Sequence, residues 1–550
     1  MNYRFLARVF LFQLLLLSAC APASASSVKP DSVRLSTASQ AAVTPTSFQP
    51  APAAPTATPA ANSLWSDPDV PEQLKDDLML QGLNQAGSSE NANIHLGSTR
   101  SAAGQGDSTW IFALVAAFPT VRDGVTLDEL KNCWAGSCPG LIMTAPTYAA
   151  MQTVFGGQAS GDLRIVPAGE LKTDLWQTHG AWGIVPFEAL GAELKVLEID
   201  GHSPIHKDFD ATTYPLKAIF RLQPAVAKLP VSNRDPQKLV TVLMTGTTAL
   251  VRAISFKMQK NGVDYPARDI GDWLRSADIL HISNEVAFTP DCPAPDPNDA
   301  SLRFCSAVDN IGLLDTIGVD VIELSGNHVN DWGHEALLYT LDLYKQRGWP
   351  VFAGGADLAA AQQPAILERG GVKFAFVGCN ASGPDFAWAT DKAPGAAPCG
   401  DYGWLVDEIK SLKAAGAVVI VALQHYEYYT PEPRPLQLED FRRLALAGAD
   451  VVSGSQAHYS QTFEFYNGAF IHYGLGNLFF DQMGYDYADG KRTTNTRREF
   501  LDRHVFYAGK LISTELLTAE LEDYSKPRPM TDEERAAFLS EYFTASGWQP

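Results

Sequence analysis

The chain has 550 residues, of which 46% are hydrophobic, so it is not mainly disordered and we expect two or three folded domains. Its 62 acidic and 42 basic side chains give a formal net charge of −20. A chain this negative lacks the positive field that nucleic-acid binding needs, and we expect no nucleic-acid partner.

The N-terminus predicts export. Arg4 and Arg8 precede a short apolar run that ends in Leu17–Cys20, with the sequence LSAC. A basic start, an apolar stretch too short to span a bilayer and then small residues are typical of a secretory signal. The LSAC end resembles a bacterial lipobox, which implies that residues 1–20 are a lipoprotein signal peptide and that Cys20 carries the lipid. The alternative is an ordinary signal peptide with an incidental cysteine.

Residues 21–62 are expected to be a tether. Of these 42 residues, 31 are Ala, Pro, Ser or Thr, and almost none is large and apolar. Such a segment cannot offset the conformational entropy that is lost on folding. We therefore expect an exported, membrane-anchored lipoprotein whose folded part is held on the extracytoplasmic side.

The six cysteines beyond Cys20 support an oxidising compartment. They fall into three pairs of near neighbours in the sequence, which favours local disulfides. The pairs are Cys133 and Cys138, Cys292 and Cys305, and Cys379 and Cys399. A zinc site is the alternative, but the spacings do not form the paired Cys-x-x-Cys pattern.

Residues 63–232 are expected to form the first folded domain. Trp110–Ala117 and Ala181–Phe187 have the composition of strands, and Thr126 is expected to cap a helix that leads to Trp134–Gly136. This order resembles one lobe of periplasmic solute-binding proteins of the phosphate-binding type. The resemblance implies a small α/β domain with a cleft for a small-molecule ligand. The alternative is a generic α/β domain that positions its neighbour.

Residues 235–550 are expected to form the second domain, with alternating strands and helices. Strands are expected at Leu239–Met244, Ile279–Ser283, Val319–Leu324, Val372–Val377, Val418–Leu423, Asp450–Ser453 and Ala469–Tyr473. Helices are expected at Ala307–Ile317, Gly333–Arg347 and Leu436–Ala447, and about Thr531–Phe543, after two further strands in Phe506–Glu522. This alternation predicts an α/β fold.

Polar residues follow several of these strands. They are Ser283–Glu285, Ser325–His328, Gln424–Glu427, Gly454–His458 and Gly474–Asn477. Ligands and catalytic groups collect in loops beyond the carboxyl ends of strands in α/β folds. One histidine in such a loop is most often a surface or capping residue, but three in equivalent places favour a converged site. Histidine, carboxylate and amide oxygen together suit Mn, Fe or Zn.

Residues 239–481 resemble the CapA family of capsule and poly-γ-glutamate synthesis proteins, which share the calcineurin-like metallophosphatase fold. The motifs that carry the resemblance are Ala277–Glu285, Gly326–Gly333, Gly354–Ala356 with Pro364, His425–Glu427, Gly448–His458 with Gln461 and Glu464, and Tyr473–Asp481. The resemblance implies layered sheets flanked by helices. It also implies that the partner is an envelope polymer or the machinery that makes it.

The same resemblance implies a site. The expected metal ligands are Glu285, Asn327, His425, His458 and Gln456, and the expected catalytic residue, facing the substrate, is His328. Asn284 and Asn477 are expected to orient these ligands through hydrogen bonds. We interpret Asp331 as the N-cap of the helix that follows it.

Two positions depart from the family pattern. Thr247 stands where the first strand of the family supplies a carboxylate, and Gln456 stands where the family has a histidine. A hydroxyl cannot supply the charge of a carboxylate, and an amide is a poorer ligand than imidazole. The site is therefore expected to hold one divalent ion (Mn, Fe or Zn) or none. The chain is either a metal-dependent hydrolase or transferase, or a scaffold or binding protein that keeps the fold without the chemistry.

Overall fold

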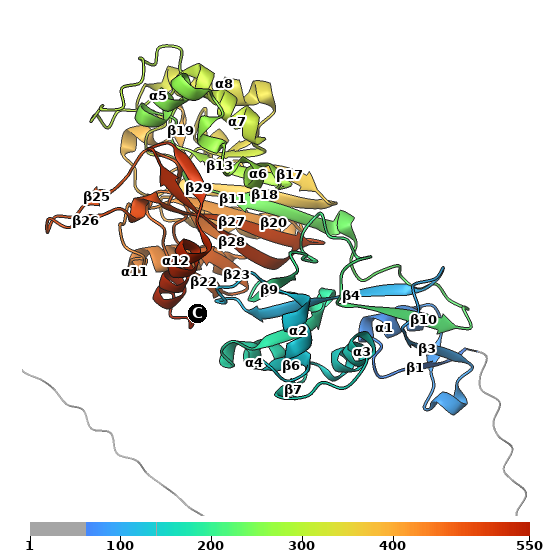
Figure 1. Ribbon diagram of the computed structural model, residues 1–550. Coiled ribbons are helices and arrows are strands. Elements are labelled where there is room, and N and C mark those ends of the chain that lie inside the picture. The colour runs from blue at the N-terminus through green and yellow to red at the C-terminus, as the bar shows by residue number, and fades with distance from the viewer. Residues whose placement is uncertain (1–61, 139) are drawn as a thin grey trace, which may run out of the picture. The chain divides into compact units, whose positions relative to one another are not determined.

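The computed structural model describes residues 62–138 and 140–550. The expected signal peptide with Cys20 and the expected tether, apart from its last residue, lie outside the described residues. The described residues all belong to one compact unit. Within it, two sets of sheets correspond to the stretches before and after residue 235, but where one domain ends and the next begins stays a prediction (Figure 1).

The N-terminal part contains a mixed sheet. Along it the strands run β2 (Asn84–Gln85), β1 (Ser63–Ser66), β3 (Ile94–Thr99), β10 (Lys217–Gln223), β4 (Ser108–Ala117), β8 (Trp182–Pro186), β6 (Leu141–Met143) and β7 (Leu163–Ile165); β9 (Leu194–Ile199) pairs with β4 and with β5 (Gly124–Val125). The helices are α1 (Glu72–Leu80), α2 (Leu127–Trp134), α3 (Ala145–Phe155) and α4 (Leu171–Gln177). Thr126 caps α2 through the N–H of Glu129, as the sequence predicts.

The C-terminal part contains two larger sheets. The first runs β15 (Val351–Phe352), β14 (Val321–Glu323), β13 (Ile279–Asn284), β11 (Leu239–Met244), β27 (Arg498–Tyr507), β28 (Lys510–Glu522) and β29 (Lys526–Pro529), with β12 (Thr247–Thr248) paired between β13 and β24 (Asn477–Phe479). The second runs β17 (Ala365–Arg369), β18 (Val372–Asn380), β20 (Val418–Gln424), β21 (Val451–Gly454), β23 (Ala469–His472) and β22 (Phe463–Tyr466). Short pairs join β16 (Gly354–Gly355) to β19 (Gly395–Ala396), and β25 (Tyr485–Asp486) to β26 (Arg492–Thr493).

Helices and turns connect these strands. The helices are α5 (Arg252–Asn261), α6 (Gly271–Arg275), α7 (Gly312–Ile317), α8 (His334–Arg347), α9 (Leu358–Ala361), α10 (Gly403–Ala414), α11 (Pro435–Ala447) and α12 (Asp532–Ala545). Turns of 3₁₀ helix lie at Ser89–Asn91, Phe187–Ala189, Pro236–Lys238, Tyr265–Ala267, Val308–Ile311, Asp385–Ala387 and Asn495–Arg497. The expected helix over residues 307–317 is thus a 3₁₀ turn followed by α7.

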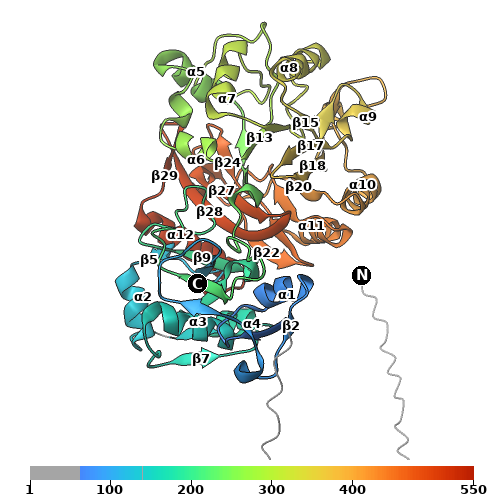
Figure 2. The ribbon, with the colours of Figure 1, turned by 90° about the vertical axis from the view of Figure 1, so that its right-hand side faces the viewer.

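The alternation of side chains along the strands explains the layers. Val242 of β11 and Phe376 of β18 belong to one buried cluster between the two C-terminal sheets. Leu243, one residue along β11, instead joins α5, α7 and α8 on the outer face, and Val377 joins α10 and α11 on the outer face of the other sheet. Helices therefore cover the outside of two packed sheets, which confirms the expected α/β class of layered sheets flanked by helices (Figure 2).

The N-terminal and C-terminal parts share a packed boundary. Phe118, just after β4, makes ring contacts with Phe465 and Trp548, at centroid distances of 5.0 and 5.7 Å. Arg535 of α12 donates to both carboxylate oxygens of Asp123 at 2.8 Å. The buried ring of Phe118, the partly buried rings packed on it and a bidentate ion pair hold the boundary together.

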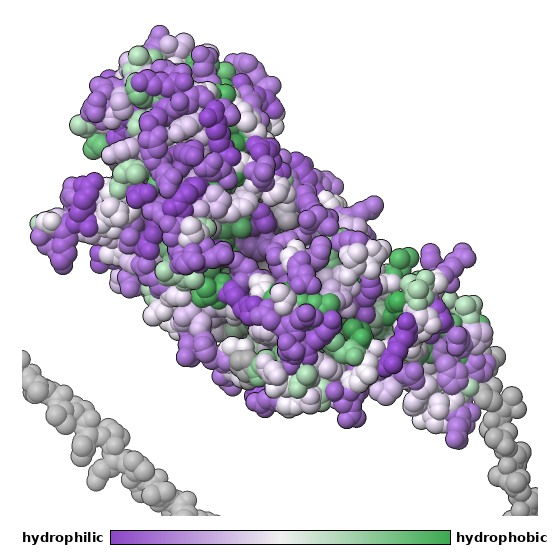
Figure 3. Space-filling model, viewed as in Figure 1, coloured by the Kyte–Doolittle hydropathy of each residue, from purple (hydrophilic) through white to green (hydrophobic). Residues whose placement is uncertain are grey.

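The expected disulfides form in all three pairs: Cys133–Cys138, Cys292–Cys305 and Cys379–Cys399. No helix of residues 62–138 and 140–550 is both long and apolar enough to cross a membrane. On the face that Figure 3 shows, hydrophobic residues form small patches among hydrophilic ones.

Candidate functional site

Parallel pairing brings the expected site residues to one edge. The backbone N–H of Glu285 donates to the carbonyl of Thr248 at 2.9 Å, and His328 forms a parallel bridge with Val286. A Cβ on Gly326 would lie 2.7 Å from the Cα of Glu285, so only glycine lets the next loop close on that residue. The chain after β14 therefore carries Asn327 and His328 directly past Glu285.

Glu285 is a buried carboxylate without a hydrogen-bond donor. Its side chain is 1% exposed, and within the described residues neither oxygen has a hydrogen-bond partner. The nearest basic atom recorded is Nε2 of His458, which lies 3.9 Å from Oε1 of Glu285. A buried charge this isolated is costly unless a cation or a proton lies beside it.

The orientation of His458 leaves that nitrogen available. Its Nδ1 lies 2.7 Å from Oδ1 of Asn477, whose Nδ2 donates to the carbonyl of Thr496 at 3.0 Å. The second bond fixes the amide, so Asn477 presents its oxygen and Nδ1 of His458 must carry the proton. Nε2 is then the nitrogen of His458 that faces Glu285. The contact with Asn477 orients the His458 ring, as a hydrogen-bonded neighbour commonly does for a metal-binding histidine.

His425 is anchored in the same way. Its Nε2 lies 3.0 Å from Oδ2 of Asp440, and Nδ1 has no hydrogen-bond partner within the described residues. Burial lowers the pKa of His425 despite the nearby charge of Asp440, so the ring is neutral near pH 7. Nδ1 is therefore a second buried nitrogen with a free lone pair.

Asn327 belongs to a buried polar network. Nε2 of Gln424 donates to its Oδ1 at 3.0 Å, and Oγ of Ser455 lies 3.3 Å from Oε1 of Gln424 and 2.9 Å from Oε1 of Glu323. Burial alone would raise the pKa of Glu323, but hydrogen bonds from His281 and two serines outweigh it and lower the pKa. The sequence analysis missed Glu323 as a member of the site, and it named Gln424 only as one of the polar residues that follow strands. The sequence feature that points to such residues is a polar side chain within or at the end of an otherwise apolar strand.

The two residues that depart from the family pattern, Thr247 and Gln456, have different roles. Thr247 donates its hydroxyl to the carbonyl of Ser455 at 2.7 Å and so ties β12 to the loop before His458. Gln456 is buried, and its Oε1 has no hydrogen-bond partner within the described residues. Neither Gln456 nor His425 hydrogen-bonds to Glu285.

Asn284 does not contact a ligand side chain through its amide nitrogen. Nδ2 donates to the carbonyl of Val286 at 2.6 Å and to the hydroxyl of Tyr344 at 2.8 Å. Asn284 therefore holds the backbone on either side of Glu285 and fixes the place from which that side chain starts.

His328 is oriented by Asp331. Its Nδ1 lies 2.7 Å from Oδ2 of Asp331, which also accepts the N–H of Phe304 at 2.8 Å. The Phe304 ring lies 4.6 Å from the imidazole. Burial alone would lower the pKa of His328, but the hydrogen bond to Asp331 and the charges of Glu285 and Asp331 raise it. The side chain is 18% exposed, so a ligand can reach it.

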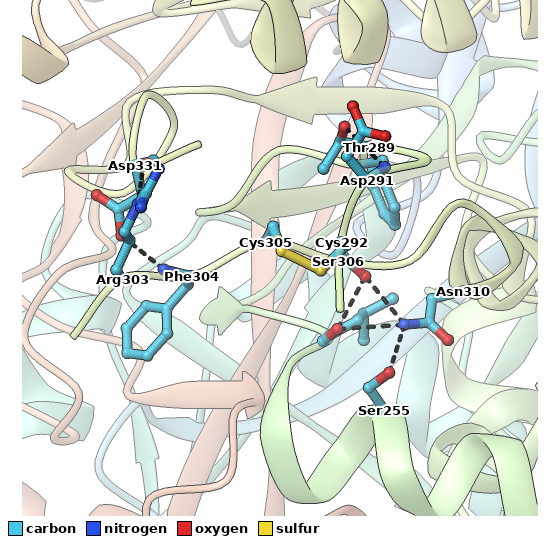
Figure 4. The surroundings of a disulfide bond; sticks show 12 residues. Ser255, Thr289, Asp291, Cys292, Arg303, Phe304, Cys305, Ser306, Asn310 and Asp331 are labelled. Carbon is cyan, nitrogen blue, oxygen red and sulfur yellow. Dashed lines mark hydrogen bonds between the residues drawn. A yellow bond between two sulfur atoms is a disulfide. The ribbon is translucent and has the colours of Figure 1, made fainter. Parts of the chain in front are cut away.

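The interpretation of Asp331 as a helix cap is therefore wrong. The N-cap of α8 is Gly333, and no side chain caps that helix. Asp331 binds His328 instead, because the loop closed by Cys292–Cys305 places Phe304 beside it. Figure 4 shows this loop beside Asp331: the backbone N–H of Phe304 donates to the Asp331 carboxylate, and Nε of Arg303 donates to the Asp331 carbonyl.

Two of the expected metal ligands, Glu285 and His458, face each other. Within the described residues, no group of three or more His, Cys, Asp or Glu side chains could hold a metal ion. Nε2 of His458 nevertheless lies 3.9 Å from Oε1 of Glu285, and Oε1 of Gln456 has no hydrogen-bond partner within the described residues. Carboxylate, imidazole and amide oxygen are ligand types that divalent Mn, Fe and Zn accept. A site for two ions would need a carboxylate at position 247, where this chain has Thr247.

The chain matches known proteins over its C-terminal part. The family model described as "Bacterial capsule synthesis protein PGA_cap" matches residues 241–482. The capsule biosynthesis protein CapA of Bacillus anthracis is 25% identical over 281 residues, which are 50% of this chain and 68% of that protein. The PGA biosynthesis protein CapA of Bacillus subtilis (strain 168) is 24% identical over 260 residues, 46% of this chain and 67% of that protein.

Solved structures match with low scores. NAD nucleotidase of Haemophilus influenzae is 12% identical, with a TM-score of 0.29 over 55% of this chain and 56% of that chain. An ABC-type phosphate transport receptor from Vibrio cholerae is 13% identical, with a TM-score of 0.25 over 29% of this chain and 85% of that chain. The family match confirms the resemblance that the sequence motifs predict: residues 241–482 match the family model of bacterial capsule synthesis proteins, and the curated relatives named above are CapA proteins.

Proposed function

We propose that this chain acts in the synthesis of a capsule or envelope polymer, of which poly-γ-glutamate is one candidate, as a cation-dependent hydrolase or transferase. The relatives named above carry capsule and PGA biosynthesis in their names. The observation that carries the catalytic part is the buried Glu285 carboxylate, which has no hydrogen-bond donor among the described residues and faces Nε2 of His458.

Glu285 and His458 would hold the cation, with amide oxygens from Gln456 and Asn327. A divalent ion bound there would polarise a substrate oxygen and stabilise negative charge that develops on it. The hydrogen bond from Nδ1 of His458 to Asn477 holds the imidazole in the orientation that this role requires.

His328 is the proton-transfer group in this proposal. Asp331 accepts from Nδ1 and leaves Nε2 to exchange a proton with the reacting group. The pKa of His328 is raised above its usual value, which favours a protonated ring that would protonate a leaving oxygen or nitrogen. Phe304 packs on the ring and limits its rotation.

The test is complementation of a deletion strain of the native host, with polymer yield as the measurement. Glu285→Gln and His328→Gln should each lower the yield by at least about tenfold while the protein accumulates normally. Asp407→Asn is the matched control, because its side chain is 83% exposed on α10, and it should complement fully.

A scaffold without catalysis is the second candidate. The observation in its favour is that Thr247 uses its hydroxyl to bind the Ser455 carbonyl where the family has a carboxylate. Full complementation by folded Glu285→Gln and His328→Gln would establish this candidate and exclude the enzyme.

We also propose that Cys20 anchors the protein to a membrane through lipid on the extracytoplasmic side. The support is the LSAC sequence after a basic and apolar start. Cys20→Ala should move the protein from the detergent phase to the aqueous phase in a phase-separation assay. If the variant stays in the detergent phase, the anchor does not depend on Cys20.

A further inference from the structure

The N-terminal part contains a cleft of about 750 Å³ at the carboxyl ends of three parallel strands. β6 pairs in parallel with β7 and with β8, so the loops after Met143, Ile165 and Pro186 start from the same edge of the sheet. All three loops line the cleft, together with the start of α1 and residues before β9. Ligands of α/β folds bind at such edges, and this volume suits a small molecule.

The walls of the cleft are mainly apolar. Phe112, Val166, Leu171, Ile184 and Leu194 contribute side chains to the lining. Ile165, a further lining residue, is 43% exposed although it is large and apolar. An apolar molecule in the cleft would remove this surface from water, which favours binding by about 25 cal/mol per Å² of surface buried.

The charged groups of the cleft are almost all acidic. The carboxylates in the lining are Asp69, Glu72, Glu188 and Glu193, and the lysine of the lining, Lys172, is paired with Glu193 at 2.8 Å. Asp69 is 8% exposed, and its Oδ1 has no hydrogen-bond partner within the described residues. Burial raises the pKa of both Asp69 and Glu188, although Glu188 accepts a hydrogen bond from Nδ2 of Asn233 at 2.7 Å.

The helix that opens onto the cleft does not offset these charges. α3 begins at Ala145, and Thr144 accepts the N–H of Thr147 through its side chain. Pro146, the second residue of α3, has no N–H. The first turn therefore has few free donors for an anion, although a helix N-terminus otherwise attracts one. Phosphate, the ligand of the solute-binding proteins that the sequence resembles, does not suit this lining.

We propose that this cleft binds a small molecule with an apolar body and a cationic amine. The apolar walls would hold the body, and Asp69 and Glu188 would pair with the ammonium group. The proposal concerns a different part of the chain from the Glu285 site and does not depend on it.

The test is calorimetric titration of the full chain with 4-phenylbutylamine. The comparison compounds are 4-phenylbutan-1-ol and 4-phenylbutyrate, which keep the body and change the head group, and inorganic phosphate. The amine should bind at least about tenfold more tightly than the alcohol, because the alcohol leaves the carboxylates unpaired. The acid and phosphate should not bind measurably.

Variants assign the binding to this cleft. Asp69→Asn and Glu188→Gln keep the size of each side chain. Each should weaken binding of the amine by about tenfold and leave binding of the alcohol unchanged. Glu90→Gln is the matched control, because Glu90 is an exposed carboxylate of the same part of the chain. Equal affinity for amine and alcohol, tighter binding of the acid or phosphate, no amine binding at millimolar concentration, or unchanged binding in both cleft variants would each overturn the proposal.

Discussion

Substituting Glu285 by glutamine should have opposite effects on stability with and without a divalent cation. In metal-free protein, both oxygens of the buried carboxylate lack donors among the described residues, and Nε2 of His458 lies 3.9 Å away as an acceptor. The amide nitrogen of glutamine can donate to that acceptor. Because an unsatisfied buried polar group costs about 1–3 kcal/mol, metal-free Glu285→Gln should be the more stable protein by about that amount.

Cation binding should make the wild type the more stable of the two proteins. At a free cation concentration of about 100 times Kd, binding stabilises the wild type by about 2.7 kcal/mol. At about 2 °C per kcal/mol for a large domain, the melting temperature should rise by about 5 °C. A variant that binds about 100-fold more weakly gains only about 0.4 kcal/mol at the same concentration, a shift of less than about 1 °C.

The assay is thermal unfolding after chelation, followed by titration with Mn²⁺ or Zn²⁺, with Asp407→Asn as the control that behaves as wild type. Equal cation-induced shifts in wild type and Glu285→Gln would refute the reasoning. A metal-free wild type that is more stable than the variant would show instead that Glu285 pairs with a protonated His458. That pair would be worth up to about 4 kcal/mol at 3.9 Å and an effective dielectric constant of about 20.

Three further predictions concern stability. Burial raises the pKa of Glu499 far above its usual 4.5. The stability of Glu499→Gln relative to wild type should therefore increase by about 1.4 kcal/mol per pH unit as pH rises from 4.5 to the folded-state pKa of Glu499. A difference in melting temperature that does not change with pH would contradict this prediction. Burial alone would lower the pKa of His206, but the hydrogen bond to Glu515 and the charge of Glu515 raise that pKa. The contact between His206 and Glu515 should therefore stabilise the folded protein fully below pH 6.5, and this stabilisation should be lost as pH rises through the raised pKa of His206. His206→Gln should abolish that part of the pH dependence in denaturant titrations. Replacing both Cys292 and Cys305 by serine should lower the free energy of unfolding by about 3 kcal/mol. An unchanged denaturation midpoint would contradict this prediction.

Strongly apolar segments made much of the C-terminal fold predictable. β11 has the bounds Leu239–Met244 that its apolar run predicts, and β20 extends one residue beyond the expected Val418–Leu423. Buried strands of a parallel sheet are nearly continuous hydrophobic runs, so their bounds stand out. Short pairs such as β25 and β26 have no such run and were not expected.

Site residues that depend on loop geometry were harder to predict. Asp331 stands two residues before Gly333, where a capping role is the simplest interpretation of the sequence, yet it binds His328 because Phe304 arrives from a distant loop. Glu323 lies at the end of an apolar strand, and only the neighbouring sheet shows that Ser455 supplies one of its hydrogen bonds. Such partners are 27 and 132 residues apart in the sequence, and spacing alone does not reveal them.

The cation content of the purified chain tests the central claim most directly. After chelation, reloading with Mn²⁺ or Zn²⁺ and removal of free ion, elemental analysis should find one ion per chain in the wild type and almost none in Glu285→Gln. No retained ion in the folded wild type, or two per chain, would contradict a single-cation site at Glu285 and His458.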